Sequence, residues 1–309
     1  MIQLESYSDE FEEEYWRAVK KKINISIQKR IVDSCIKFLP TNFFTGNKDE
    51  FFKSLILAPF DKLKKAEELI ATQKISIMKK ECFHKNDKKR SKIKKVYKTI
   101  YDSYTPIMKS QEKGISMRVR IVKNSRLTVC PYCNRDYINS RAGNVSGAQL
   151  DHFFSKAEFP LFAICLYNLV PVCGNCNRVK SAKTLAFASP FDKCINWEKD
   201  ITFTYSGSTL KDLKIEIIAK GSLKNNIKSM GIINAYQIHG MEVLELIEKE
   251  QMYSISQKEE LIKVLGPGNL SEIEIKKIIF GPEITKECMR TKPLGKMMSD
   301  LHKELKIYN

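Results

Sequence analysis

Two Cys-x-x-Cys pairs constrain the fold of this 309-residue chain more than any other feature of its sequence. Cys130 and Cys133 form the first pair, and Cys173 and Cys176 form the second. The turn within each pair presents two thiolates on one side of an ion, so the two pairs together can complete a tetrahedral zinc site. Four sulfur ligands leave no coordination position open, and we therefore expect this zinc to be structural.

The other cysteines and the start of the chain indicate the compartment. Cys35, Cys82, Cys165, Cys194 and Cys288 are scattered, odd in number and mostly among apolar neighbours. Unpaired cysteines of this kind are typical of a reducing compartment, where they act as small core residues. No apolar run approaches the roughly 20 residues of a membrane-spanning helix, and the acidic segment 1–14 is unlike a secretory signal. We therefore expect a soluble cytoplasmic protein with no membrane partner.

The charge balance points to a polyanionic partner. The chain has 53 Lys and Arg against 36 Asp and Glu, a formal net charge of +17, which favours nucleic acid. An ordinary surface in a lysine-rich organism would give the same totals. The basic run 79–98 is interrupted by acid only at Glu81 and Asp87, and it is either a phosphate-contacting surface or a solvated linker. The candidate contacts within it are Lys88, Lys89, Arg90, Lys94 and Lys95.

Apolar spacing predicts a helical, basic N-terminal region over 1–110, suited to docking nucleic acid or a partner. A helix over 8–38 begins with Ser8 as cap and acidic residues in its first turns, followed by basic ones, as the helix dipole favours. Further helices are predicted over 49–57 and 62–80, and the basic run continues as a helix to about Tyr104.

The remainder of the chain mixes strands with helices. Period-two alternation over 115–121 predicts a strand, with a helix as the alternative, and two strands are predicted over 201–205 and 213–218. A long helix over 223–253 and a last helix after Pro293 follow. We expect an α+β fold in which helices predominate, with a compact unit over 111–198 and a β-hairpin plus helices over 199–309.

Polar residues between and beside the cysteine pairs are those that a hydrolytic metal centre uses. Asp151 and His152 are adjacent in a segment that suits the end of a strand opening into a loop, and Asn168 and Asn177 follow. An imidazole can take a proton near neutral pH, and carboxylate and amide oxygens are ligands of hard divalent ions. Adjacent side chains on a strand point to opposite faces, so cooperation between Asp151 and His152 requires the backbone to bend.

The series His152, Asn168 and Asn177, set within the cysteine frame over about 127–185, resembles the HNH endonucleases of the His-Me finger (ββα-metal) class. The resemblance implies a zinc-braced strand-loop-strand-helix core that hydrolyses phosphodiester bonds. It implies His152 as general base, Asp151 and Asn177 as ligands of Mg²⁺ or Mn²⁺, and Asn168 as a support for the loop. It also implies phosphate contacts from Arg178, Lys180 and Lys183. The segment 156–161 departs from the glycine-bearing loop common in this family.

Each of these residues has a structural alternative. His152 could be an ordinary core or surface histidine, Asn177 a left-handed turn residue and Asp151 a turn cap. The neighbouring aromatic residues are more simply explained as packing than as stacking partners of bases. They are Tyr132, Phe153, Phe154, Phe159, Phe162 and Tyr167.

The amino-acid sequence of segments 150–156 and 167–171, and more loosely that of the tail 292–300, resembles HNH proteins of bacterial anti-phage defence systems of the Septu and retron-associated types. That resemblance implies an effector nuclease whose flanking regions dock an ATPase partner, with DNA as the favoured substrate. Two other functions remain open: an HNH toxin that cleaves RNA, including tRNA, and a zinc-ribbon nucleic-acid-binding protein that does not cut. No pattern in the chain indicates an oligomeric state.

Overall fold

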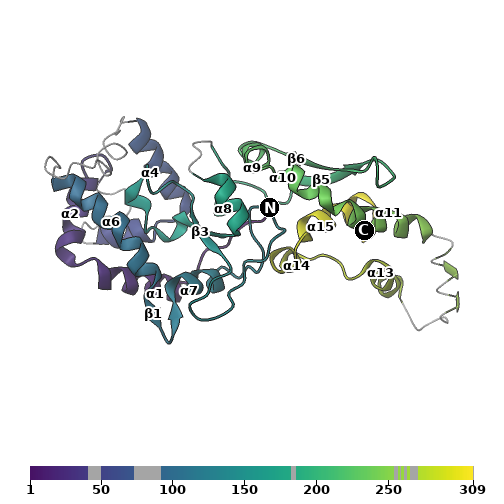
Figure 1. The fold of residues 1–309 in the computed structure, drawn as a ribbon, viewed down its shortest axis with the longest axis horizontal. Helices are drawn as coiled ribbons and strands as arrows, with labels where there is room; N and C mark the ends of the chain where they lie inside the picture. The colour runs from purple at the N-terminus through teal and green to yellow at the C-terminus, as the bar shows by residue number, and fades with distance from the viewer. Residues whose placement is uncertain are drawn as a thin grey trace.

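The computed structural model describes residues 1–40, 50–72, 92–181, 186–253, 257, 259–260, 263–264 and 271–308. Figure 1 shows an elongated molecule, with the N-terminal helices at one end, β3 and α8 in the middle and the C-terminal helices at the other end. The fold is α+β with helices predominating, and the sheets within these ranges are two-stranded and antiparallel. The described helices all fall short of the length and hydrophobicity that crossing a lipid bilayer requires.

The predicted helix over 8–38 is two helices, α1 (Asp9–Lys22) and α2 (Ile25–Cys35). Ser8 caps α1 as expected, since its side chain accepts a hydrogen bond from the Phe11 amide. The backbone is extended at Ile23, where α1 ends, and Asn24 caps the second helix by accepting from the Ile27 amide. A local capping signal therefore breaks an apolar stripe that looks continuous in the sequence.

Within its described residues, the N-terminal region has three more helices: α3 (Phe51–Ile56), α4 (Phe60–Thr72) and α6 (Lys92–Met108). They correspond to the helices predicted over 49–57, 62–80 and the end of the basic run. The helix predicted to reach residue 80 is described only to Thr72, and most of the basic run, including Lys88, Lys89 and Arg90, lies outside the described residues.

The strand predicted over 115–121 is wrong for most of its length. Only β2 (Ile115–Ser116) is extended, pairing with β1 (Gln111–Glu112), and the chain then forms α7 (Met117–Asn124). Arg118 and Arg120 make the sequence alternate between polar and apolar residues, but the two side chains have different surroundings. Arg120 is buried and pairs with Glu14 and Glu112, whereas Arg118 is exposed. The ion pairs allow a charged residue on the buried side of a helix, which the alternation could not reveal.

The middle of the chain has the order strand, strand, helix. β3 (Gln149–His152) pairs with β4 (Leu169–Val172), with Asp151 opposite Val170. Two short 3₁₀ turns, η3 (Pro160–Phe162) and η4 (Leu166–Asn168), lie in the connection. Cys173 then caps α8 (Gly174–Lys180), because its sulfur accepts a hydrogen bond from the Cys176 amide.

The C-terminal region begins with the predicted hairpin, β5 (Ile201–Ser206) paired with β6 (Lys214–Ala219). The single helix predicted over 223–253 is instead broken into α9 (Leu223–Ser229), α10 (Ile232–Tyr236), the 3₁₀ turn η5 (Gln237–His239) and α11 (Gly240–Met252). Gly231 adopts φ +62°, a left-handed conformation that interrupts the helix. The chain continues with α13 (Glu272–Phe280), α14 (Lys286–Thr291) and α15 (Gly295–Glu304), the last as predicted after Pro293.

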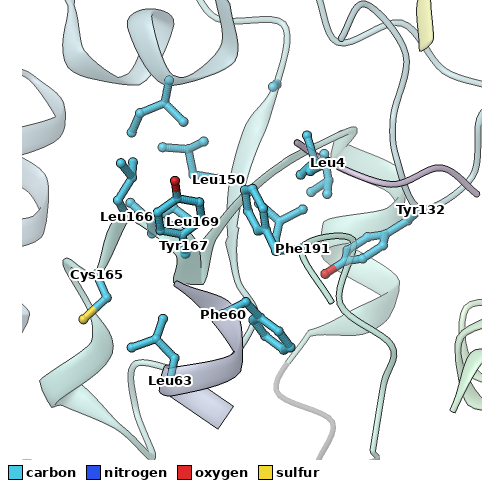
Figure 2. Close-up of a cluster of buried hydrophobic side chains, with 14 of the residues drawn as sticks. Leu4, Phe60, Leu63, Tyr132, Leu150, Cys165, Leu166, Tyr167, Leu169 and Phe191 are labelled. Atoms are coloured by element: carbon cyan, nitrogen blue, oxygen red, sulfur yellow. The ribbon is translucent and has the colours of Figure 1, made fainter. Parts of the chain in front are cut away.

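A hydrophobic core surrounds the β3–β4 hairpin and joins distant parts of the sequence. Figure 2 shows Leu4, Phe60 and Phe191 from separate segments near Leu150 of β3 and Leu169 of β4. The first residues of the chain are tied in by backbone hydrogen bonds from Ile2 to Pro131 and from Leu4 to Pro190. The hairpin is therefore held from several sides.

Asn134, just after the first cysteine pair, fastens the C-terminal helices to this core. It is fully buried with φ +55°, its amide nitrogen donates to the Met289 carbonyl at 2.7 Å, and its amide oxygen accepts from the Lys296 amide at 2.8 Å. Its own carbonyl accepts from the Leu294 amide at 2.7 Å. A single residue therefore forms hydrogen bonds with backbone groups both at the start of α15 and in α14.

Replacing Asn134 should loosen this attachment. Asn134→Ala leaves a buried carbonyl and a buried amide without partners and puts alanine in a left-handed conformation, so we expect the free energy of unfolding to fall by about 2–4 kcal/mol. Urea denaturation measures the change. Asn124→Ala, which removes one hydrogen bond at an exposed position, is the control and should cost less than about 1 kcal/mol. Equal effects of the two substitutions would contradict the attachment.

Candidate functional site

The two cysteine pairs meet in space. The sulfur atoms of Cys130, Cys133, Cys173 and Cys176 all lie within 4.8 Å of one another, all four residues are buried, and Cys133 Sγ lies 4.0 Å from Cys173 Sγ. A tetrahedral zinc ion with Zn–S distances of about 2.3 Å places its sulfurs about 3.8 Å apart. The cluster therefore has the composition and dimensions of a structural zinc site, as the sequence predicted.

Backbone amides point at two of these sulfurs. Cys133 Sγ accepts from the Arg135 amide and Cys173 Sγ accepts from the Cys176 amide, each at 3.4 Å. Hydrogen bonds of this kind stabilise negative charge on a thiolate. Each turn is itself closed by a backbone bond, from Asn134 to Cys130 in the first pair and from Asn177 to Cys173 in the second.

Tyr132 connects the cysteine cluster to Asp151. Its side chain is fully buried, as the packing role predicted from the sequence requires, and its hydroxyl also donates a hydrogen bond to Asp151 Oδ2 at 2.8 Å. No sequence pattern indicates this second contact, because Tyr132 and Asp151 are brought together only when the cluster closes. The cluster thus orients a carboxylate on β3.

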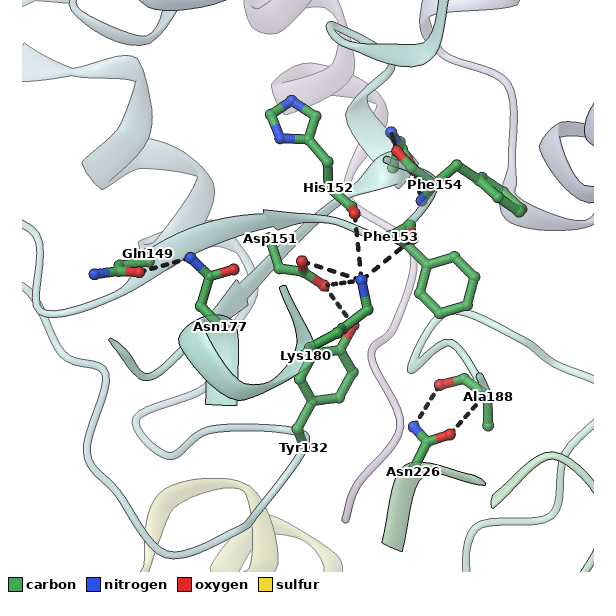
Figure 3. A network of polar contacts seen from close by, with 11 residues as sticks. Tyr132, Gln149, Asp151, His152, Phe153, Phe154, Asn177, Lys180, Ala188 and Asn226 are labelled. Carbon is green, nitrogen blue, oxygen red and sulfur yellow. Dashed lines mark hydrogen bonds and ion pairs between the residues drawn. The ribbon is translucent and has the colours of Figure 1, made fainter. Parts of the chain in front are cut away.

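Asp151 is buried and paired with Lys180, the last residue of α8. The Lys180 ammonium lies 3.1 Å from Asp151 Oδ1 and 3.0 Å from Oδ2, and it also donates to the backbone carbonyls of His152 and Phe153 at 3.4 and 3.3 Å. Figure 3 shows these contacts converging on one nitrogen. The sequence placed Lys180 among the phosphate contacts, whereas this ammonium faces inward, with 3% of the residue exposed.

His152 is held in one tautomer. Its Nε2 lies 2.9 Å from the Ala163 carbonyl, which can only accept, so Nε2 carries the proton and Nδ1 has a free lone pair. Burial lowers the pKa of His152 to about 4. The hydrogen bond to Ala163 raises the pKa, and the charges of Lys156 and Lys180 lower it further. The imidazole is therefore neutral at pH 7.

Asn168 is fully buried and fixes the loop that follows His152. Its amide oxygen accepts from the Phe154 amide at 2.8 Å, and its amide nitrogen donates to the carbonyls of Phe154 and Phe162 at 3.1 and 3.0 Å. The Asn168 carbonyl also accepts from the Phe153 amide. These contacts are of the kind that the resemblance assigns to this position.

Asn177 lies on α8 beside β3. Its amide nitrogen donates to Gln149 Oε1 at 2.6 Å, and Figure 3 shows the amide oxygen on the side of Asp151. The His152 ring extends from β3 in another direction than Asp151, as neighbouring strand residues do. The structure thus brings Asp151 and Asn177 onto one side of the hairpin and His152 onto the other.

The other predicted nucleic-acid contacts are only partly described. Arg178 is exposed and donates to Asn175. Lys94 and Lys95 belong to α6, and Lys183 lies outside the described residues, like Lys88, Lys89 and Arg90.

Two cations near His152 were not predicted. The Lys156 ammonium lies 4.7 Å from the ring centres of both Tyr101 and Tyr104. The ring centres of Tyr104 and His152 lie 4.6 Å apart, and Arg118 donates a hydrogen bond to the Tyr104 hydroxyl. The folding of α6 and α7 against the loop brings these side chains together, so no local motif could have identified them.

Comparison of the chain with protein-family models, curated proteins and solved structures finds no match. The functional argument therefore depends on the chemistry of the residues themselves. Their arrangement combines a cluster suited to zinc, a buried carboxylate, an amide oxygen beside it and a neutral histidine of fixed tautomer.

The purified protein should contain one tightly bound zinc ion per chain, measured by inductively coupled plasma mass spectrometry. Cys176→Ser removes one of four thiolates, and because binding energy at such a site is folding energy, we expect loss of most zinc and a thermal midpoint lower by about 5 °C or more. Cys194→Ser makes the same chemical change at an exposed position and should retain full zinc. Full occupancy in Cys176→Ser would contradict the assignment.

Proposed function

We propose that the protein is a metal-dependent endonuclease of the HNH type that hydrolyses phosphodiester bonds of DNA. The observation that carries this proposal is the junction of one strand-strand-helix unit with the four-cysteine cluster, which supplies Asp151 and His152 from β3 and Asn177 from α8. The net charge of +17 supports a polyanionic substrate.

His152 would act as the general base once the backbone at the end of β3 bends, because its ring and the side chain of Asp151 point to opposite sides of the strand. His152 Nε2 donates its proton in a hydrogen bond to the Ala163 carbonyl. His152 Nδ1 can therefore accept a proton from a water molecule that attacks the phosphorus atom. A neutral imidazole is required for this step, and the low pKa of His152 keeps the ring neutral at cellular pH. The contacts of Asn168 with the loop at Phe154 and Phe162 would hold the base in place.

Asp151 and Asn177 would hold the divalent ion. Mg²⁺ and Mn²⁺ prefer oxygen ligands, and a carboxylate with an amide oxygen on its side of the hairpin is a donor set of that kind. Gln149 binds the Asn177 amide nitrogen and so favours the orientation in which the oxygen is available. When bound, such an ion stabilises negative charge on the phosphate and the departing oxygen.

Cations around the hairpin would position the nucleic acid. Exposed Arg178 lies on the α8 side, and exposed Arg118 and half-buried Lys156 lie on the His152 side. The flanking regions 1–110 and 199–309 would provide further contacts. As part of the same proposal, these regions would dock the ATPase of an anti-phage defence system, with the chain as its effector nuclease.

The direct test is cleavage of plasmid DNA with Mg²⁺, Mn²⁺ or EDTA. We expect metal-dependent cutting, and we expect His152→Ala to lower the rate at least about 100-fold because it removes the general base. His239→Ala is the matched control, since this histidine is partly exposed, bonds to Arg135 and Glu242, and has no assigned role in the reaction. It should leave the rate within about threefold.

The assay includes single-stranded RNA, tRNA and DNA with the partner ATPase added. Zinc content and circular dichroism establish that each variant is folded. Cutting by His152→Ala at the wild-type rate would contradict the assignment of the base. Cleavage of RNA but not of DNA would show that RNA is the substrate. Binding of DNA without cleavage under all these conditions would contradict the proposal that the protein is an enzyme.

A further inference from the structure

The buried ammonium group of Lys180 is paired with the carboxylate of Asp151, which the proposed function assigns as a ligand of the divalent ion. Asp151 is 5% exposed and Lys180 is 3% exposed, and both carboxylate oxygens lie within about 3 Å of the ammonium nitrogen. Tyr132 takes a further lone pair of Oδ2. A divalent ion would need the same oxygens and would be repelled by a positive charge held so close to them. Lys180 and the metal ion are therefore competitors for one carboxylate.

Lys180 has other partners that do not depend on Asp151. Its ammonium lies 3.4 and 3.3 Å from the carbonyls of His152 and Phe153, and 5.4 and 5.7 Å from the ring centres of Phe153 and Phe187. Carbonyl oxygens and aromatic faces both stabilise a cation away from water. The ammonium can therefore leave the carboxylate without losing all its contacts.

A cavity next to Lys180 offers the place to which the ammonium can move. Its volume is about 550 Å³, and Lys180 itself lines it, together with Phe153, Phe187, Glu67, Glu68 and Glu158. Burial, and then the charges of Glu68 and Glu158, raise the pKa of Glu67. The cavity also contains Lys64, but Lys64 faces Asp192 at 3.6 Å. The Glu67 carboxylate would be stabilised by an additional cation.

We propose that Lys180 is a displaceable internal cation: its ammonium neutralises Asp151 in the metal-free protein and turns toward the acid-lined cavity when a divalent ion binds. This inference rests on the proposed function, because it takes Asp151 as the metal ligand. The exchange keeps the buried carboxylate paired at all times, and it lowers the affinity for metal. Lys180 thereby sets the ion concentration at which the site fills.

The test is the affinity of the zinc-loaded, full-length protein for Mn²⁺, measured by titration calorimetry. Lys180→Met removes the competitor while keeping a side chain of similar length, so Mn²⁺ should bind at least about tenfold more tightly. Lys296→Met is the matched control. Lys296 is also a buried lysine, 2% exposed and 2.6 Å from Asp300, but it lies in the C-terminal region, and its replacement should leave the Mn²⁺ affinity unchanged.

Glu67→Gln tests the destination of the ammonium group. Removing a carboxylate from the cavity disfavours the displaced position, so Mn²⁺ should bind about three- to tenfold more weakly in the wild-type background and with unchanged affinity in the Lys180→Met background. This variant also decides the question should Lys180→Met fail to fold. Weaker binding in Glu67→Gln then supports the exchange, and unchanged binding overturns it.

Unchanged or weaker Mn²⁺ binding by folded Lys180→Met would overturn the proposal and make Lys180 a positioning residue for Asp151. Absence of Mn²⁺ binding by both proteins would overturn it as well. Cleavage by the wild-type protein is measured separately. Cutting that needs His152, combined with unaltered affinity in Lys180→Met, would reject the exchange and retain the nuclease. Tighter binding without cutting would retain the exchange and reject the nuclease.

Discussion

Four sulfur atoms from two distant turns lie within 4.8 Å of one another, and several parts of the molecule are fixed by the residues around them. Cys173 caps α8, and Tyr132 binds Asp151 on β3. Asn134 holds the backbone of α14 and the start of α15, and Tyr236 of α10 donates to the Cys133 carbonyl at 2.6 Å. Because repulsion between bare thiolates at these distances is large, an ion at their centre would stabilise the hairpin, α8 and the C-terminal attachment together.

The second constraint is the burial of charge around β3. A carboxylate removed from water is costly unless it is paired and hydrogen-bonded, and Asp151 obtains both from Lys180 and Tyr132. On the other side of the strand, His152 avoids the cost by remaining neutral and donating to Ala163. One of these neighbouring residues is therefore a carboxylate paired with an ammonium group and the other is a neutral imidazole, which is the division of roles that a metal ligand and a base require.

The sequence predicted the features that depend on local chemistry and missed those that depend on the fold. Regular spacing identified the cysteine cluster, the β5–β6 hairpin and the helix after Pro293. Alternation over 115–121 failed because the ion pairs of Arg120 stabilise a buried charge on α7. Helix breaks at Asn24 and Gly231 depend on single backbone conformations that periodicity does not register. The inward ammonium of Lys180 and the hydroxyl contact of Tyr132 join residues far apart in sequence, so no motif could indicate them.

Hydrogen-deuterium exchange of the zinc-loaded protein, compared with protein treated with a chelator, tests most directly whether the cysteine cluster organises the site. Loss of the ion should increase exchange at β3, α8 and residues 289–296, which are connected to the cluster through Tyr132, Cys173 and Asn134. Helix α2, at the end of the molecule opposite the C-terminal helices, should keep its protection. Unchanged protection of β3 and α8 after verified removal of the ion would contradict the account.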